Sequence, residues 1–516
     1  MVYSKDGFTW TPSAGRREGL PTIGVVVPPT HSADPDHAAQ DVVHDVIVIG
    51  AGYAGLVASR DLSTQGKKTL LLEARDRLGG RTWHATINGF NYEMGGTWIH
   101  WHMPHIYREV SLYGLHNDWI VTQNPGGKED YFTAMTGDEQ RTLTHDEEVD
   151  ICGRVYEIFS NLDGDDLKHS WKYAFGTDQS PELMAKWDKL SCQDRLDQIR
   201  DQLTDEETSM LVSQLMQMGG TTLDKIGLVG ALRWWALGSH TGTGLNDIAL
   251  HTRLCSGQSE LHRRIFEHAV STDNLSYQFD APVQHVEDNT STGGLVSVTT
   301  RDGTVFRARA VICTVPINVL ASVGFTPVLP ADKVEAVQNS MTVNRCNKVH
   351  VDLNGPDYLS WGSLATPGKG LISAFGDHLT PADNSHLVCF GPDPDCDAGL
   401  SLDNIDGIKD ALVHLLPKAK QSEAVFNRIV SHNWNKDEFA NGTWYFPPPN
   451  ATTKYLQILQ RPHGSVYFAS ADWSDGWCGW IDGAVQSGAQ NAHQVIQDLR
   501  KAAKGVGKKV NGVNGV

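Results

Sequence analysis

The sequence predicts an α/β protein in which a Rossmann-type nucleotide-binding domain is interrupted by an inserted, mixed α+β domain. Three observations support this fold class. A glycine-rich strand–turn–helix lies near residue 50, a helix-rich stretch follows it, and buried β-type segments resume near residue 253. A chain of 516 residues is also long for one hydrophobic core, so more than one domain is expected.

The nucleotide-binding unit is predicted from the order of its pieces. Val46 to Ile49 is a short β-branched run, typical of a buried parallel strand. Gly50 to Gly55 follows at once, and Leu56 to Gln65 has helical periodicity. A second apolar strand, Thr69 to Leu72, ends at Glu73. An isolated glycine turn would be a weak signal, but the complete series predicts a dinucleotide site.

Each polar or glycine position in this unit has an expected task. Gly50 allows a tight turn, Gly52 lets the backbone approach a pyrophosphate, and Gly55 lets the helix pack close to the strand. The helix N-terminus offers free N–H groups to the pyrophosphate. Glu73 lies 23 residues after Gly50, where a carboxylate can accept hydrogen bonds from a ribose.

Two glycine doublets follow the unit and narrow the choice of dinucleotide. The first continues out of the second strand as Gly79-Gly80-Arg81, and the second is Met94-Gly95-Gly96-Thr97-Trp98. Paired glycines can be simple turns. At these distances from a Rossmann unit, however, they resemble the signature of flavin amine oxidases, in which FAD takes the place of NAD.

The resemblance covers roughly residues 40–500 and implies an FAD-binding domain of the GR2, or amine oxidase, type. Backbone of Val283 would lie against the adenine, Asp472 would bind the ribityl chain, and the Ile481 amide would face the isoalloxazine. The residues that the resemblance places around the cofactor are Gly50, Gly52, Tyr53, Ala54, Gly55, Glu73, Ala74, Arg75, Gly80, Arg81, Gly95, Gly96, Thr97, Trp98, Val283, Trp434, Asp472 and Ile481.

Lys348 is the first candidate catalytic residue, because it lies in the apolar segment Cys346 to His350. A buried ammonium is costly without a partner, and a lysine at a strand edge that points to solvent is the alternative. In flavin amine oxidases, the matching lysine holds a water against flavin N5, where oxygen reacts.

Trp444 and Trp480 are the other candidates, matching the two aromatic residues that flank the amine in monoamine oxidases. Aromatic faces attract a cation and shape the path of a neutral amine. Without the flanking motifs, both would be interpreted as core residues. Tryptophan at these positions resembles fungal monoamine oxidases more than animal ones. Thr443 stands where animal enzymes carry the cysteine bonded to the flavin, so FAD is expected to be held non-covalently.

The domain organisation is predicted from changes in composition and in helix or strand patterning along the chain. Residues 1–40 are predicted to form an extended arm on the surface or over a partner subunit, which allows a homodimer. The FAD-binding domain is expected at 41–120, 250–335 and 440–503, and the substrate-binding domain at 121–249 and 336–439. Residues 504–516 are expected to be a disordered tail. Within the insertion, one of Trp234 and Trp235 is expected in the core.

Composition excludes several classes of partner. The net charge of −18 argues against nucleic acid and anionic membranes, which need a basic surface. Scattered cysteines, the absence of an apolar signal region and of any long apolar run indicate an intracellular, soluble, cytoplasmic protein. The C-terminus lacks a Ser-Lys-Leu-type peroxisomal ending. No histidine spacing is typical of a metal site, and His100 and His102 are interpreted as an ordinary polar pair.

The function expected from the resemblance is oxidation of a primary or secondary amine to an imine, which hydrolyses to aldehyde and ammonia. Molecular oxygen would be reduced to hydrogen peroxide. Two alternatives lie in the same superfamily: a polyamine oxidase, which needs acidic residues along a tunnel, and an L-amino-acid oxidase, for which Arg345 or Arg233 would bind the carboxylate. A third is a dehydrogenase-like or non-catalytic flavoprotein that reacts poorly with oxygen.

Overall fold

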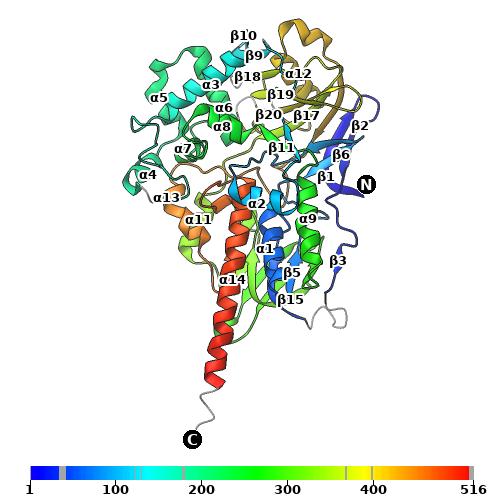
Figure 1. Cartoon of the computed structure of the whole chain (residues 1–516), viewed down its shortest axis with the longest axis vertical. Coiled ribbons are helices and arrows are strands. Elements are labelled where there is room, and N and C mark those ends of the chain that lie inside the picture. Colours follow the sequence, from blue (N-terminus) through cyan, green and yellow to red (C-terminus); the bar gives the residue numbers. More distant parts are fainter. Residues whose placement is uncertain are drawn as a thin grey trace.

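The computed structural model describes residues 2–33, 42–122, 124–129, 131–176, 180–365, 369–396 and 399–510, with side chains as far as residue 503. In Figure 1 the lower half holds helices α1 (Tyr53–Thr64), α9 (Gln258–Val270) and α14 (Ile481–Val510) beside a sheet. The upper half holds a second sheet with helices on its left and at its top. The expectation for residues 504–516 falls on residues outside the part described with side chains.

The lower sheet contains the predicted nucleotide-binding unit. Its strand order is β16-β13-β14-β15-β4-β5-β12-β3, and β22 also pairs with β15. Strands β12, β5, β4 and β15 are mutually parallel, as is β22 with β15. The strands are β3 (Thr30–His31), β4 (Val43–Ile49), β5 (Thr69–Leu72), β12 (Leu275–Gln278), β13 (Val283–Asp288), β14 (Val296–Thr300), β15 (Val305–Cys313), β16 (Gly324–Thr326) and β22 (Val466–Phe468).

Both faces of this sheet are covered, as the uninterrupted apolar strands predict. Val46 and Val48 of β4 pack in the core that contains α1, α9 and α14. Ile47 and Ile49 point the other way, into a core with α10 (Ile317–Leu320), α11 (Ala331–Asn339) and α13 (Thr452–Gln460). The alternation follows from the two-residue period of a strand.

One predicted pair of strands is a single strand. The alternation of Val305 to Ala308 after an Asp302-Gly303 turn signal and the apolar run Ala310 to Pro316 predict two separate strands. The structure has one, because β15 runs without a break from Val305 to Cys313. Its first half pairs with β14 across the predicted Asp302-Gly303 turn, and its second half pairs with β4 and β22. Arg309, between the two halves, points its side chain to solvent, so the strand can continue through this charged residue without a turn.

The upper sheet has the order β10-β9-β18-β19-β20-β17-β21-β1-β2. On β17 and β20, Val349 and Cys389 pack against α12, whereas Lys348 and Phe390 lie on the opposite face. The elements are β1 (Val2–Thr11), β2 (Gly15–Thr22), β9 (Phe132–Thr136), β10 (Glu139–Leu143), β17 (Asn347–Leu353), β18 (Gly362–Ala365), β19 (Ser373–Leu379), β20 (Ser385–Gly391), β21 (Phe426–Ser431) and α12 (Ile405–Leu415).

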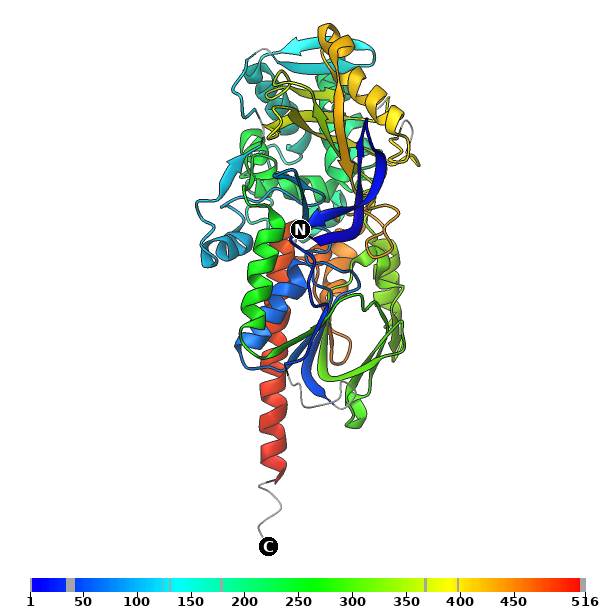
Figure 2. The same ribbon diagram turned by 90° about the vertical axis from the view of Figure 1, so that its right-hand side faces the viewer.

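Residues 2–22 differ from the expected extended arm. They form the hairpin β1–β2, and Phe8 to Trp10 of β1 pair with β21, so the segment is built into the edge of the upper sheet (Figure 2). The prolines fit this arrangement: Pro12 lies in the turn, and Pro21 lies on β2, the edge strand, where a missing N–H is tolerated. Residues 34–41 lie outside the described part of the chain.

Apolar residues at i, i+3/i+4 spacing predict two helices in the insertion, over 147–162 and 207–218. Both are confirmed, as α3 (His145–Ser160) and α6 (Asp205–Gly219). Both begin with a capping box, from Thr144 and Thr204. The other elements are β6 (His84–Ile87), β7 (Phe90–Glu93), α2 (Pro104–Leu112), β8 (Trp119–Val121), α4 (Pro181–Trp187), α5 (Cys192–Ile199), α7 (Leu228–Leu237), α8 (Gly242–Ala249) and β11 (Thr252–Leu254).

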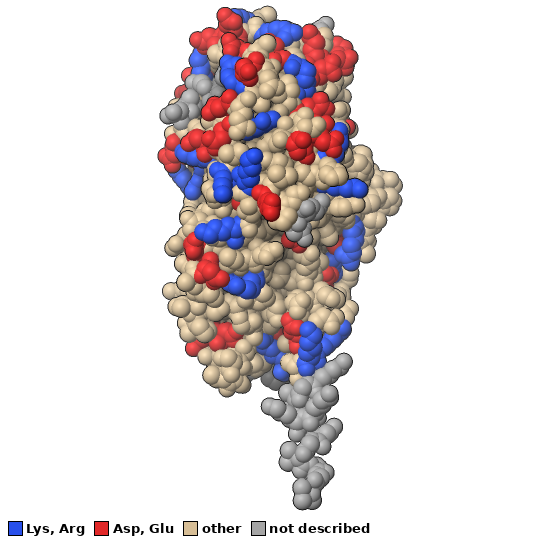
Figure 3. Space-filling view, turned by 90° about the vertical axis from the view of Figure 1, so that its left-hand side faces the viewer, with Lys and Arg blue, Asp and Glu red and all other residues tan. Residues whose placement is uncertain are grey.

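The division into domains stays a prediction, but two of its boundaries need to move. The limits after residues 120 and 335 fall inside β8 and α11. Among the described residues, no helix combines the length and apolar character needed to cross a bilayer. On the face shown in Figure 3, basic and acidic side chains are interspersed, without a continuous basic area.

Candidate active site

A single cavity of about 400 Å³ collects nearly all the predicted site residues. It extends between the two sheets, with lining residues from β4, β5 and β13 of the lower sheet and from β17 to β20 of the upper one. The predicted residues that line it are Gly50, Gly52, Tyr53, Ala54, Glu73, Ala74, Arg75, Gly80, Arg81, Gly95, Gly96, Thr97, Trp98, Val283, Lys348, Trp434, Trp444, Trp480 and Ile481. Gly55 and Asp472 are not among the lining residues.

The glycines of the strand–helix turn are required by close packing. Gly50 has φ +103°, and a Cβ there would lie 2.4 Å from Thr314 Oγ1. A Cβ on Gly55 would lie 1.8 Å from the Gly50 carbonyl oxygen, so Gly55 serves helix packing and not the cavity wall. At Gly52, by contrast, the nearest protein atom to such a Cβ is 3.8 Å away. Gly52 therefore leaves space on the cavity side of the α1 N-terminus.

Glu73 holds the shape of this turn. Its carboxylate accepts hydrogen bonds from the backbone N–H of Ala51 (2.5 Å) and of Arg75 (2.9 Å), one on each oxygen. Burial raises the pKa of Glu73, and these two bonds partly offset that effect. A carboxylate has about four acceptor positions, so Glu73 keeps capacity for a ribose hydroxyl in the cavity.

The two glycine doublets form one packed corner. A Cβ on Gly95 would lie 2.0 Å from the Arg81 carbonyl oxygen, and one on Gly96 would lie 2.7 Å from Thr82 Cγ2. Trp434 closes the corner by donating its indole N–H to the Met94 carbonyl (2.8 Å). The second doublet is thus glycine because the first loop lies against it.

Asp472 differs from the expected cofactor contact. Its carboxylate is fully buried and accepts one bond from Arg81 Nη2 (2.6 Å) and another from the Ile317 backbone N–H (2.9 Å). Arg81 also donates to the Thr443 carbonyl (3.0 Å). Asp472 therefore orients Arg81, which does line the cavity, and is a positioning residue in this structure. A fully buried carboxylate needs such a partner because an unpaired buried charge is costly.

Lys348 is buried, and its ammonium is held within the cavity wall. It donates to Thr97 Oγ1 (2.5 Å) and to the Gly95 carbonyl (3.1 Å), and lies 4.8 Å from the centre of the Trp98 ring. Burial lowers the pKa of Lys348, and the nearby buried Glu93 acts in the opposite direction. The solvent-exposed alternative for this lysine is therefore wrong.

Trp444 and Trp480 both line the cavity, from separate segments. Trp444 donates its indole N–H to the Met218 carbonyl (2.9 Å) and packs edge-on against Phe390. Trp480 packs on Trp234 with ring centres 4.7 Å apart, and its indole nitrogen has no hydrogen-bond partner among the described residues. Trp234 is thus a cavity wall, whereas Trp235 is fully buried in the core.

Sequence reasoning missed the helical wall of the cavity. Helix α3 contributes residues at helical spacing, and α6 contributes Gln214, Gln217 and Met218. The signal was available in the i, i+3/i+4 pattern, but a polar residue on such a stripe cannot be assigned to a cavity without the neighbouring helix. The α3 residues are His145, Glu148, Val149, Cys152, Gly153 and Tyr156.

The two arginines considered for a substrate carboxylate do not line this cavity. Arg345 is half-buried and donates to Asn441 Oδ1 (3.1 Å). Arg233 is buried beside a separate small pocket formed with Tyr445 and Cys478. The arrangement gives the L-amino-acid oxidase alternative no support.

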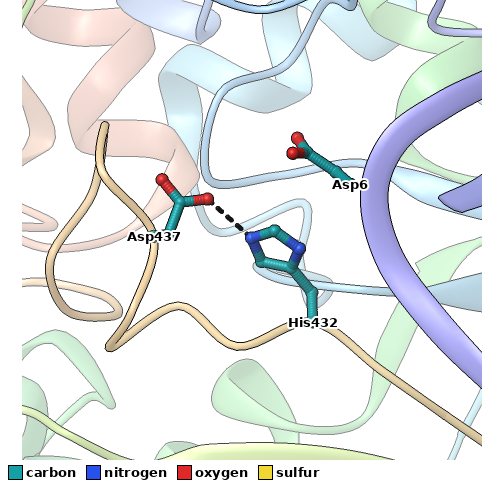
Figure 4. Close-up of side chains that lie close together, drawn as sticks. All are labelled: Asp6, His432 and Asp437. Atoms are coloured by element: carbon teal, nitrogen blue, oxygen red, sulfur yellow. Dashed lines mark hydrogen bonds and ion pairs between the residues drawn. The ribbon is translucent and has the colours of Figure 1, made fainter. Parts of the chain in front are cut away.

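Asp6, His432 and Asp437 form a cluster of potential metal ligands (Figure 4). Two arginines already occupy it: Arg75 bonds to Asp6 (3.0 Å) and Asp437 (2.5 Å), and Arg77 bonds to Asp6. Burial disfavours the charged Asp6 carboxylate, but Arg77 and Arg75 outweigh that effect and hold its pKa below the usual value. Two guanidiniums already neutralise both carboxylates. We therefore interpret the cluster as an ion-pair network that joins Asp6 of β1 and Asp437 to Arg75 and Arg77, which follow β5.

The sequence matches the family described as "Flavin containing amine oxidoreductase" over residues 53–496, and the chain belongs to that family. It is 29% identical to pseudooxynicotine dehydrogenase from Pseudomonas sp over 466 residues, covering 89% of this chain and 88% of that protein. It is 24% identical to the flavin-containing amine oxidase B of Bos taurus over 479 residues, covering 89% and 87% of the two chains. Among solved structures, putrescine oxidase bound to putrescine has a TM-score of 0.73 at 22% identity, covering 88% of this chain and 99% of that one.

Membership of the family implies a flavin cofactor, and the cavity fits one. Gly52 and Gly80 bring two backbone segments together at its wall, where a Cβ on Gly80 would lie only 3.3 Å from Gly52 Cα. The N-terminus of α1 opens onto the same place, which suits a pyrophosphate. Glu73 would supply the ribose acceptor, and Gly95, Gly96 and Ile481 line the wall farther along the chain.

Proposed function

We propose that this flavin amine oxidoreductase uses non-covalent FAD to oxidise a primary or secondary amine to the imine, with oxygen as electron acceptor. The imine would then hydrolyse to an aldehyde and ammonia or a smaller amine. One observation carries the proposal: the nucleotide-binding glycines, the buried Lys348 and the two tryptophans line one cavity. FAD, when bound, supplies the hydride-accepting chemistry.

Non-covalent attachment is supported by the side chains near Trp444. Thr443 donates its hydroxyl to Asn344 Oδ1 (2.7 Å) and offers no thiolate. Cys346, the residue before β17, also lines the cavity, but burial raises its pKa to about 12. A thiol must lose its proton to act as a nucleophile, so Cys346 is also a poor site of attachment.

Trp444 and Trp480 are proposed to guide the amine. Their π faces favour an approaching cation, and the apolar wall favours loss of its proton before oxidation. Several further aromatic residues line the cavity, which suits an aryl-alkyl or alkyl group. These residues are Tyr131, Phe132, Tyr156, Trp234, Trp361, Phe375 and Phe390.

A second candidate function, a dehydrogenase, differs from the proposed oxidase in its electron acceptor. Two relatives are named dehydrogenases, pseudooxynicotine dehydrogenase and nicotine dehydrogenase, whereas (S)-6-hydroxynicotine oxidase is named an oxidase. The buried ammonium of Lys348 favours oxygen in our proposal, since a fixed positive charge stabilises the negative charge that oxygen gains on reduction.

The test is a panel of aryl-alkyl, alkyl and polyamino substrates, with peroxide formation and reduction of an artificial acceptor followed side by side. Peroxide produced in step with aldehyde supports the oxidase. Turnover only with the artificial acceptor would assign the chain to the dehydrogenase alternative. No turnover with either acceptor would reject amine oxidation for this panel.

A further inference from the structure

The helical wall of the cavity contains a feature that amine oxidation itself does not require. Glu148, Cys152 and Tyr156 of α3 follow one another at four-residue spacing and all line the cavity. Residues at this spacing lie on one face of a helix. Helix α3 therefore runs along the cavity and presents to it a phenol, a thiol and a carboxylate in succession.

The phenol end of this series is the end near the proposed site of oxidation. Tyr156 donates its hydroxyl to Met218 Sδ (3.1 Å), and the Met218 carbonyl accepts from the Trp444 indole (2.9 Å). Glu148 is eight residues, or about 12 Å along a helix, from Tyr156. The side chain of His145, beyond Glu148, is 40% exposed, so this end of the cavity approaches solvent.

The Glu148 carboxylate has no strong cationic partner in the described part of the chain. The Cys152 thiol donates only a weak hydrogen bond to Glu148 Oε1 (3.8 Å), and His145 Nδ1 lies 3.6 Å from Oε2, which is too far for a hydrogen bond. Lys128 also lines the cavity, but its ammonium makes no ion pair with Glu148 and lies near the Tyr131 ring. Burial raises the pKa of Glu148 to about 7, which shows how poorly its charge is compensated.

A second unpaired group lies on the neighbouring helix. Gln214 of α6 lines the cavity, and its buried Oε1 accepts no hydrogen bond from the part of the chain that the structure describes. Helices α3 and α6 pack against one another. The other acids that line the cavity are engaged: Glu438 pairs with Arg301, and Glu73 holds the Ala51 and Arg75 amides.

We propose that Glu148, assisted by Gln214, binds a second basic nitrogen at the far end of the amine substrate. The preferred substrates would be amines that carry one distal ammonium or N–H group, separated from the oxidised nitrogen by an apolar spacer. A bound cation would neutralise Glu148, and the N–H groups would satisfy Gln214 Oε1. This inference rests on the proposed function and names the substrate class of the same site.

The experiment compares Glu148→Gln with wild type on a homologous series of α,ω-diamines and on monoamines of matching length. We expect wild type to prefer diamines of one length. Glu148→Gln should lower kcat/KM for those diamines by about 10- to 100-fold, mainly through KM, as expected for loss of a charge-assisted hydrogen bond. Monoamines should change by no more than about twofold. Inhibition of monoamine turnover by the best diamine should weaken in parallel.

Two further variants make the result decisive. Glu157→Gln, on the exposed side of α3, should leave the diamine preference unchanged. Gln214→Leu should lower diamine kcat/KM selectively and serves if Glu148→Gln folds poorly. Equal losses on monoamines and diamines, or no diamine preference in wild type, would overturn the inference while leaving amine oxidation intact. Failure of every amine to react would instead reject the proposed function, and the inference with it.

Discussion

Replacement of Lys348 by methionine separates the structural and chemical parts of the account. Methionine has a similar volume and no charge, so it fills the same space. The ammonium bonds to Thr97 Oγ1 and the Gly95 carbonyl, but Thr97 also donates to Gly95 (3.0 Å), so both oxygens keep a partner. Both partners are neutral, so the replacement breaks no direct salt bridge in the described part of the chain and removes the desolvation cost of a buried ammonium.

The expected change in unfolding free energy is therefore small, about 1–2 kcal/mol in either direction. Burial already raises the pKa of Glu93, and loss of the neighbouring ammonium raises it further, so Glu93 takes a proton instead of remaining an unpaired charge. Reoxidation of the reduced protein by oxygen should slow much more. A charge-assisted interaction of about 1.5–3 kcal/mol corresponds to a factor of about 10–100 in rate.

The assay is stopped-flow mixing of amine-reduced protein with oxygenated buffer, alongside anaerobic reduction by the same amine. Lys454→Met, at an exposed ion pair with Glu335, is the control and should match wild type in both steps. Reoxidation of Lys348→Met at the wild-type rate would refute the role of its ammonium. A loss of several kcal/mol in stability would refute the packing argument.

Three further predictions concern other parts of the site. Trp480→Phe should retain most activity, because the indole nitrogen has no hydrogen-bond partner among the described residues. Trp444→Phe loses a hydrogen bond and should lower the free energy of unfolding by about 0.5–1.5 kcal/mol. If the two variants had the same turnover and the same melting temperature, this distinction would be contradicted. Asp6→Asn should cost about 3–5 kcal/mol in urea unfolding because it leaves the buried Arg77 guanidinium without its carboxylate, while exposed Asp403→Asn should cost under about 1 kcal/mol; a shared midpoint would remove the ion-pair interpretation. With Thr443 in place of a bonding cysteine, acid precipitation should release the yellow cofactor into solution, and colour retained in the pellet would show a covalent link.

The parts of the molecule that sequence predicted well are those fixed by local patterns. The strand–glycine–helix unit around Gly50 is a contiguous stretch, and its period and glycines describe its own geometry. Lys348 was found because a lysine within an apolar strand is unusual, and the structure buries it. The family resemblance supplied the order of the remaining segments.

The parts that sequence did not predict depend on partners far along the chain. Asp472 is bound by Arg81, 391 residues away, so its role could not be read from its own segment. The β1–β2 hairpin is fixed by pairing with β21, and prolines alone suggested an arm. Glu148 was part of a predicted helix, but only the position of α6 and the two sheets shows that it faces a cavity.

The most direct test of amine oxidation is anaerobic mixing of the yellow protein with a saturating aryl-alkyl amine or diamine. We expect the absorbance of oxidised flavin to disappear in one turnover, with release of one equivalent of aldehyde. Admission of oxygen should then restore the absorbance with one equivalent of hydrogen peroxide. Persistence of the yellow absorbance with every amine would contradict the assignment of an amine substrate to this cavity.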